Sequence, residues 1–171
     1  MERTYQYTDI RHFGWGHIFR VGAVGGLIAA VVMMLGEMLV TLMMGMDILM
    51  PPRMMAGILL GPGALDPAQV DLMSAMLAGM MVHLVLSITY GIVFAAVVAA
   101  MPALGTIGSI LLGLVFGLAL WVVNFYIVAP AAGWNWFAQD TDPLVQSSLH
   151  AVTFGAALGW YVGAFLKRER A

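Results

Sequence analysis

The chain of 171 residues contains no cysteine and few charged residues. Without cysteine it can form neither disulfides nor thiolate metal sites, and a cysteine nucleophile is excluded. Only 9% of the residues are Asp, Glu, Lys or Arg, whereas a soluble domain carries about a quarter. The formal net charge of -2 provides no basic surface for a nucleic acid. The 62% of hydrophobic residues that dominate instead are typical of an integral membrane protein.

Four apolar runs are long enough to cross about 30 Å of hydrocarbon as helices. These runs are residues 21–46, 75–101, 106–129 and 144–166. We therefore predict an all-α fold in which residues 1–171 form a single membrane domain, an up-down four-helix bundle. Residues 1–20 are expected to form an arm at the inner membrane surface.

The basic residues predict the orientation of these helices. Most of them flank the two ends of the chain: Arg3, Arg11, Arg20, Lys167, Arg168 and Arg170. Between the runs only Arg53 occurs. Because basic residues stay on the cytoplasmic side, we expect both termini to be cytoplasmic. The predicted location is the bacterial cytoplasmic (inner) membrane.

The first outer loop, residues 47–74, is itself apolar. Prolines before it and Gly61-Pro62-Gly63 after it predict a short helix over residues 52–60 that lies in the membrane interface. The Asp-Pro-Ala-Gln sequence at residues 66–69 is typical of a helix start, so we expect the second helix to begin near Pro67. Asp142 before Pro143 predicts the start of the fourth helix in the same way.

Each run also carries one polar side chain: Glu37, His83, Asn124 or His150. Counting 1.5 Å per residue from the inner end of each run places all four at a depth of about 25–28 Å. An ionisable group inside a bilayer costs roughly 2.5 kcal/mol or more, so such groups usually face the protein interior at a functional site. We therefore expect a buried polar layer near the periplasmic side.

Four interpretations of this layer are compatible with the sequence. It can be a purely structural network, since interhelical hydrogen bonds contribute about 0.6–2 kcal/mol each, and then no cofactor is bound. Glu37, His83, Asn124 and His150 can be ligands of a transition metal, because imidazole suits Zn, Cu, Fe or Ni. His83 and His150 can hold haem b between diagonal helices, an arrangement that resembles the cytochromes b of quinol-oxidising complexes. The fourth interpretation is a quinone or proton site.

Methionine is abundant in the outer half of the first helix and in the loop after it. The residues are Met33, Met34, Met38, Met43, Met44, Met46, Met50, Met54 and Met55. Thioethers are soft ligands for Cu(I). Methionine also fills irregular apolar spaces and lines promiscuous binding surfaces. The sequence allows both roles.

A stripe of small residues on the fourth helix consists of Gly155, Gly159 and Gly163. Such stripes allow two transmembrane helices to approach closely. At 100° per residue, Gly159 lies about 180° from His150. If His150 faces the bundle interior, the stripe faces outward. This geometry predicts contact with a helix of another subunit or of a second copy of the chain.

The polar residues also suggest an internal repeat. The matched spacings of eleven residues are Gly26 to Glu37 with Gly113 to Asn124, and His83 to Phe94 with His150 to Tyr161. They predict that the chain consists of two copies of a helix pair, related by an axis along the membrane normal.

Residues 22–163 resemble a bacterial family of small four-helix integral membrane proteins of unknown function. The resemblance is carried by the Gly- and Ala-rich first helix, by the Met-Met-Ala-Gly sequence at residues 54–57, and by His83 and His150. It implies the fold but no activity. The family carries a small or hydroxyl residue at the position of Glu37, so the acidic group is a departure from its pattern.

These observations favour an accessory subunit of a larger membrane complex, either energy-transducing or copper-linked. The alternatives are a small membrane cytochrome or metal-binding protein with His83 and His150 as ligands, and a small transporter or proton/quinone-site protein. A stand-alone enzyme is not expected, because no nucleophile and base occur together. The expected partners are membrane lipid and, through the fourth helix, other transmembrane subunits or a second copy, with no nucleic acid.

Overall fold

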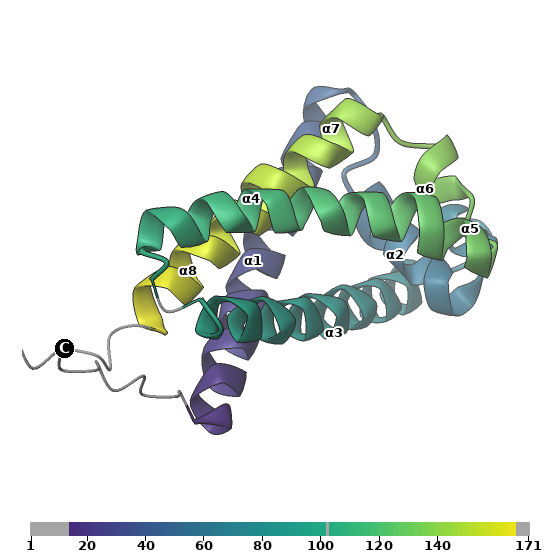
Figure 1. The fold of residues 1–171 in the computed structure, drawn as a ribbon. Helices are drawn as coiled ribbons and strands as arrows, with labels where there is room; N and C mark the ends of the chain where they lie inside the picture. Colours follow the sequence, from purple (N-terminus) through teal and green to yellow (C-terminus); the bar gives the residue numbers. More distant parts are fainter. Residues whose placement is uncertain (1–13, 102, 167–171) are drawn as a thin grey trace, which may run out of the picture.

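The computed structural model describes residues 14–101 and 103–166, and this part of the chain is all-helical (Figure 1). The first half contains α1 (Trp15–Met43), α2 (Met50–Leu60), the 3₁₀-helix η1 (Pro62–Leu65) and α3 (Leu72–Ala99). The second half contains α4 (Thr106–Val123), the π-helix η2 (Asn124–Val128), α5 (Ala129–Ala132), α6 (Trp136–Gln139), α7 (Pro143–Ser148), the π-helix η3 (Leu149–Ala156) and α8 (Ala157–Phe165). The predicted all-α fold is confirmed.

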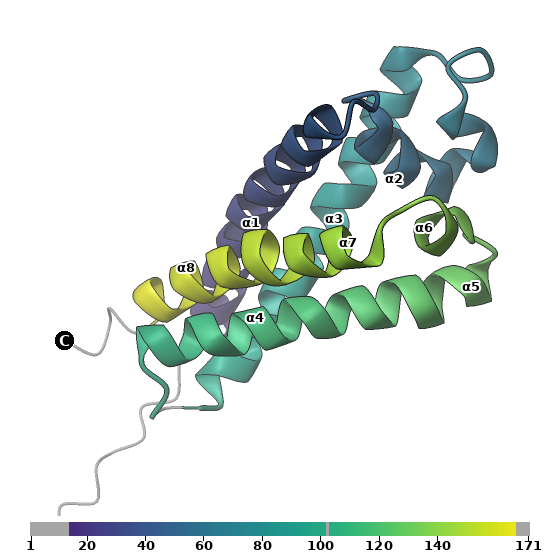
Figure 2. The ribbon, with the colours of Figure 1, turned by 90° about the horizontal axis from the view of Figure 1, so that it is seen from above.

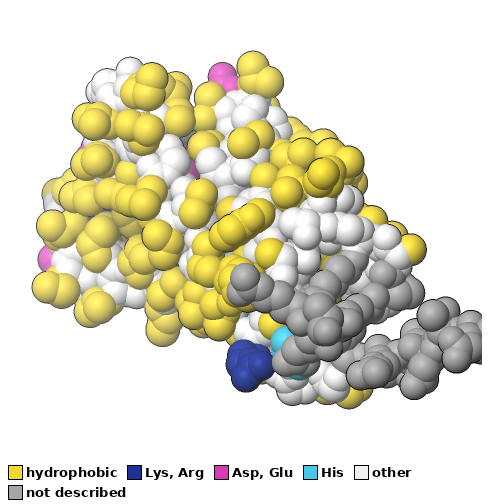
Figure 3. Space-filling model, turned by 90° about the vertical axis from the view of Figure 1, so that its left-hand side faces the viewer, with side chains coloured by type: hydrophobic (Ala, Val, Ile, Leu, Met, Phe, Trp, Pro, Cys, Tyr) yellow, Lys and Arg dark blue, Asp and Glu magenta, His cyan; other side chains and the backbone are white. Residues whose placement is uncertain are grey.

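Within the described residues, three helical stretches are long and apolar enough to cross a membrane: α1, α3 and residues 106–132, which run through α4, η2 and α5. Large apolar side chains such as Leu35, Leu77 and Val115 point outward from them and are more than half exposed. Figure 3 shows one face of the molecule that is covered largely by such side chains. A soluble protein rarely exposes so much contiguous apolar surface, so the structure indicates a membrane protein.

The helices form two antiparallel pairs (Figures 1 and 2). In one pair α1 packs against α3, and in the other α4 packs against η3 and α8, while α1 also contacts η3 and α8 and so joins the pairs. The start of α1, the connection from α3 to α4 and the end of α8 lie at one end of the molecule. The short helices α2, α5 and α6 lie at the other end.

Glycines bring α1 and α3 into backbone contact. A Cβ atom added to Gly22 would lie within 3 Å of the backbone of Gly91 and Ile92, and one added to Gly26 would meet the backbone of Ser87. Only glycine permits this approach, which replaces side-chain packing by close contact of the two helices. One further turn along, the carbonyl of Ala30 on α1 meets the side chain of His83 on α3.

The second pair repeats these contacts. A Cβ atom on Gly159 would meet the backbone of Ser109, and one on Gly113 would meet the backbone of Gly155. Gly117 lies against the backbone of His150, as Ala30 lies against the side chain of His83. The contact of Gly117 with His150 corresponds to that of Ala30 with His83 in the predicted internal repeat, whereas the contacts of Gly113 with Gly155 and of Ser109 with Gly159 are shifted by one residue from that register. The two helix pairs are therefore packed in a similar way.

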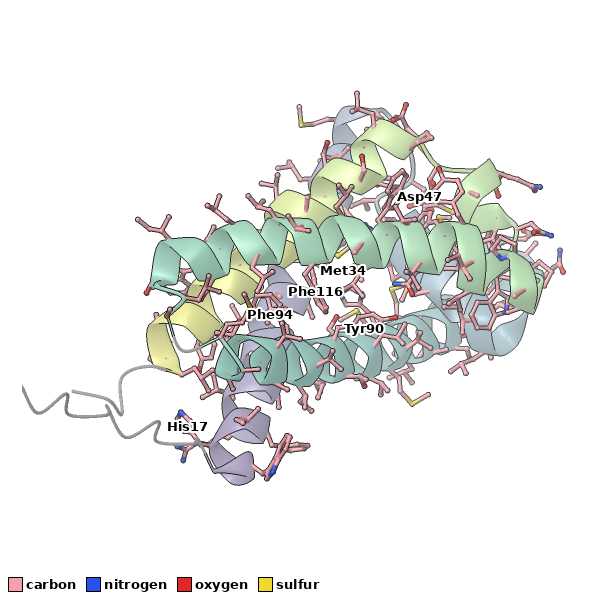
Figure 4. The ribbon with its side chains drawn as sticks, viewed as in Figure 1. His17, Met34, Asp47, Tyr90, Phe94 and Phe116 are labelled. Atoms are coloured by element: carbon pink, nitrogen blue, oxygen red, sulfur yellow. The ribbon has the colours of Figure 1, made fainter. Side chains whose placement is uncertain are left out.

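The apolar core occupies the half of the molecule near the chain termini. Phe94, Leu158 and Val162 are fully buried there, and the rings of Phe94 and Phe116 are 5.1 Å apart between α3 and α4 (Figure 4). Toward α2 and α6 this packing is replaced by a cavity, which is described below. The core therefore fixes the helix pairs at one end and leaves them separated at the other.

Several boundaries differ from the prediction. Helix α1 begins at Trp15, within the predicted arm, and ends at Met43. The helical stretch that begins with α4 continues past Pro130 to Ala132, and it ends at Gly133 in the left-handed conformation. Residues 1–13 of the predicted arm and the basic residues after residue 166 lie outside the described residues. The predicted orientation therefore stays a prediction.

The predicted helix start at Asp66 is wrong. Asp66 accepts hydrogen bonds from the backbone of Ala68 and the side chain of Gln69, but these close a turn, and α3 begins only at Leu72. The N-cap of α3 is Asp71, whose carboxylate accepts a hydrogen bond from the backbone of Ser74. Hydrogen bonds from Ser74 hold the pKa of Asp71 below its ordinary value, and those from Ala68 and Gln69 do the same for the pKa of Asp66. The other predicted start is confirmed, since Asp142 caps α7.

The short helix predicted in the outer loop is present as α2, whereas its place in the membrane interface stays a prediction. It is held by Arg53, which is 3% exposed and donates hydrogen bonds from Nη1 to the carbonyls of Ala64 and Val70 over 3.0 and 3.1 Å. Gly79 of α3 lies against the backbone of Pro52. Through these contacts α2 covers the end of the α1–α3 pair at which α1 ends and α3 begins.

Candidate functional site

The four residues of the predicted polar layer line one cavity of about 350 Å³. They come from four elements: Glu37 from α1, His83 from α3, Asn124 from the start of η2 and His150 from η3. The volume lies in the range of pockets that hold small molecules. The four residues that counting along the helices placed at a common depth therefore line the same cavity.

The histidines are each anchored to a backbone carbonyl. His83 donates from Nε2 to the Ala30 carbonyl over 3.0 Å, and His150 donates from Nδ1 to the Gln146 carbonyl over 2.8 Å. Because a carbonyl oxygen can only accept, these bonds assign the proton positions in the neutral rings. The remaining nitrogens, His83 Nδ1 and His150 Nε2, are then acceptors. Both side chains are more than nine-tenths buried, so their orientation is fixed by packing.

Asn124 is anchored by a residue that the sequence analysis did not identify. Tyr90 donates a hydrogen bond from its hydroxyl to Oδ1 of Asn124 over 2.8 Å, which leaves the Asn124 amide N–H groups as donors. Tyr90 also lines the cavity and lies between α3 and α4 (Figure 4). A signal was present, because Tyr90 follows His83 by seven residues, two helical turns along the same face.

Glu37 differs from the other three residues of the layer. In the described part of the chain its carboxyl group makes no hydrogen bond and no ion pair, although it lines the cavity. A carboxyl group that serves only to join helices would have a partner, because an unsatisfied polar group in a membrane interior is costly. The carboxyl group of Glu37 is therefore the group of the layer that the fold leaves without a partner and able to contact a ligand.

Both π-helices lie at the cavity. Asn124 begins η2, and His150 is the second residue of η3. Such segments are rare, since they widen the helical turn, and they occur frequently at functional sites. The π-helix η3 also directs the His150 ring toward Phe125, with the ring centroids 5.4 Å apart and the planes at 89°. No sequence pattern identified these two segments.

The wider turns of η3 also explain why the interpretation of the glycine stripe is wrong. Gly155, Gly159 and Gly163 do not face outward, because Gly113, Ser109 and Thr106 of α4 lie against them. The prediction assumed 100° per residue between His150 and Gly159, whereas residues 149–156 turn less per residue. The stripe and the His150 side chain can therefore both face into the molecule.

The remaining lining is mainly apolar, with the polar side chains of Thr41, Ser87, Thr141 and Gln146 among it and two acidic groups at the exposed edge. Six methionines line the cavity: Met33, Met44, Met46, Met50, Met54 and Met55. Aromatic side chains line it as well: Tyr90, Phe125, Trp134, Phe137 and Phe154. The exposed Asp140 and Asp142 lie in the lining on the side of α6 and α7.

The described residues give no geometric support for a metal centre built from the whole polar layer, which stays a prediction. No three His, Asp or Glu side chains among them are placed to hold one metal ion. A haem between the histidines would bind His83 Nδ1 and His150 Nε2, since the other two nitrogens are bonded to carbonyls. The arrangement is that of an open cavity with separated polar groups.

Comparison of the chain with models of protein families, with curated proteins and with solved structures finds no match. The function must therefore be inferred from the cavity itself, and the resemblance in the sequence stays a prediction.

Proposed function

We propose that this protein binds a small, mainly apolar molecule with a polar group inside the membrane. The observation that carries the proposal is the convergence of Glu37, His83, Asn124 and His150, from four separate elements, on one cavity of about 350 Å³. Binding cavities for small molecules are mostly apolar and contain a few well-placed polar groups. The methionines favour ligands of variable shape, because thioether side chains adapt to what they contact.

A purely structural polar layer fits the contacts less well. His83 and Asn124 do take part in hydrogen bonds that join helices, to Ala30 and from Tyr90, but His150 bonds only within its own helical stretch, to Gln146, and Glu37 makes no hydrogen bond among the described residues. A network that only joins helices would also use Glu37, since an unsatisfied carboxyl group costs free energy in the membrane. The cavity between them has the room and the chemistry for a ligand.

The proposed setting is a four-span protein of the bacterial cytoplasmic membrane, with both termini in the cytoplasm. Three spans follow from length and apolarity, and the fourth is the continuous helical stretch 143–165 that α7, η3 and α8 form. The cavity then opens toward the periplasmic side, where α2 and α6 lie. A role as an accessory subunit stays a prediction, although the helix face that suggested an outside partner is covered by α4.

The experiment is to fill the cavity. Leu120 of α4 lines it, whereas Leu118 of the same helix is 44% exposed on the outside. Leu120→Trp adds volume in the cavity, and Leu118→Trp is the matched control. The probe is 4-phenylbutan-1-ol, and binding is measured by equilibrium dialysis of the protein in lipid nanodiscs, with empty nanodiscs subtracted.

We expect Leu120→Trp to lower the affinity for this alcohol about tenfold or more, because overpacking a filled site displaces the ligand. Leu118→Trp is expected to bind like the wild type. Equal affinity in all three proteins, or no binding above empty nanodiscs, would show that the cavity does not bind such molecules.

A further inference from the structure

Three of the four residues in the polar layer present acceptors to the cavity. Glu37 contributes a carboxyl group, and His83 and His150 each contribute one acceptor nitrogen, because the other nitrogen of each ring already donates to a carbonyl. Tyr90 gives its hydroxyl proton to Asn124, so within this layer the Asn124 amide is left as the donor. Thr41, Ser87 and Gln146 also line the cavity and can both donate and accept, and Oε1 of Gln146 is a buried acceptor without a hydrogen-bond partner among the described residues. A complementary ligand therefore supplies donors.

The charge of the lining has one sign. Glu37 inside the cavity and Asp140 and Asp142 at its mouth are acidic, and no Lys or Arg in the described part of the chain lines it. An anion would meet these carboxylates without a compensating charge, and like charges at close range disfavour binding. A positive group would meet Glu37, which has no other partner among the described residues.

The apolar lining selects among cations. The faces of aromatic rings attract ammonium groups, and Tyr90 from α3, Phe125 from η2 and Phe137 from α6 line the cavity. An inorganic ion would require several close ligands, but no three acidic or histidine side chains of the described chain are gathered for one. The lining therefore matches a cation with an apolar body.

From these contacts we infer that the ligand is a hydrophobic organic amine, whose ammonium group pairs with Glu37 and whose apolar body lies among the aromatic and methionine side chains. The inference rests on the proposed function and names the chemical class of its ligand. Asp140 and Asp142 attract the cation to the mouth, and Glu37 holds it inside. Its apolar part allows the amine to reach the cavity from the membrane surface.

The test compares two probes that differ only in the polar end. 4-Phenylbutylamine carries an ammonium group at neutral pH, and 4-phenylbutan-1-ol carries a neutral hydroxyl group. Both are measured by equilibrium dialysis with the protein in nanodiscs of neutral lipid. The variants are Glu37→Gln, which keeps the shape and removes the charge, and Glu37→Asp, which keeps the charge. Wild-type-like thermal unfolding of each variant shows that it is folded.

The wild type is expected to bind the amine at least about tenfold more tightly than the alcohol. Glu37→Gln is expected to lose most of this preference while it retains affinity for the alcohol, and Glu37→Asp is expected to keep part of the preference. If Glu37→Gln does not fold, the amine assignment is still tested by the wild-type preference for the amine over the alcohol and by the part of this preference that Glu37→Asp keeps.

Equal binding of the two probes to the wild type would overturn the amine assignment and leave the cavity as a site for neutral molecules. An amine preference that persists in Glu37→Gln would also overturn it, since the charge would then be recognised elsewhere. Binding of neither probe would refute the proposed function together with this inference.

Discussion

The contact between α1 and α3 offers a sharp test of the fold, because two glycines on the same helix, Gly16 in its first turn and Gly26 in its interior, have very different surroundings. A Cβ atom added to Gly26 would lie 2.9 Å from the carbonyl carbon of Ser87 and 3.0 Å from the Cα of Ile88, in addition to meeting the Ser87 oxygen. A Cβ atom added to Gly16 would meet no atom of the described residues within 4 Å. Gly26→Ala and Gly16→Ala therefore make a matched pair.

The magnitudes follow from two opposing effects. Alanine in place of glycine stabilises a helix by up to about 1 kcal/mol. At Gly26 the new methyl group also pushes against backbone atoms, which cannot rotate away, and overpacking of this kind costs about 1–3 kcal/mol. We expect Gly16→Ala to be neutral or stabilising, and Gly26→Ala to be about 1–3 kcal/mol less stable than Gly16→Ala.

The assay is equilibrium unfolding of the purified protein in mixed micelles with increasing denaturing detergent. Gly26→Ala should also weaken ligand binding, because separating α1 from α3 lengthens the hydrogen bond between Ala30 and His83. If the two variants are equally stable, α1 and α3 do not approach as closely as the structure shows, and the packing argument fails.

Two further predictions concern the outer loop. Arg53→Leu removes two hydrogen bonds from a buried guanidinium group and leaves the Ala64 and Val70 carbonyls without them. Since bonds to charged groups contribute about 1.5–3 kcal/mol each, we expect at least 2 kcal/mol of lost stability and faster proteolysis between α2 and α3, with Arg53→Lys less affected. The pKa of Asp71 is held below its ordinary value of 3.8, so its contribution to stability is complete above that pH and is lost as the pH falls through the pKa of the folded state. Thermal unfolding in this acid range should therefore show a smaller dependence on pH in Asp71→Asn than in the wild type, and identical profiles would contradict the cap.

Much of the fold is predictable because membranes impose strong rules on sequences. An apolar run of sufficient length has few alternatives to a helix, so α1, α3 and α4 lie where the hydropathy indicates. The starts of the helices were predicted less reliably from local capping residues. Asp142 and Asp66 have the same apparent signal, yet only Asp142 caps a helix, because α2 and Arg53 hold the chain around Asp66 in a turn.

The candidate site was predictable in part for the same reason. Polar residues are so costly in apolar helices that Glu37, His83, Asn124 and His150 were identifiable one by one, and counting residues gave their common depth. Tyr90 was not identified, because a tyrosine in a membrane helix is not unusual enough to attract notice. Its role follows from the hydrogen bond to Asn124, which joins residues from two separate helices.

The sequence by itself determined the class of the protein, the places of its long helices and the depth of its polar residues, since each depends on local composition and on the fixed rise of a helix. The tertiary structure decided which way the side chains face. The π-helix η3 changes the rotation between His150 and Gly159, so the glycines pack on α4 and the histidine still lines the cavity. Helical rotation accumulates over many residues, and a single widened turn redirects everything after it, which no count along the sequence can reveal.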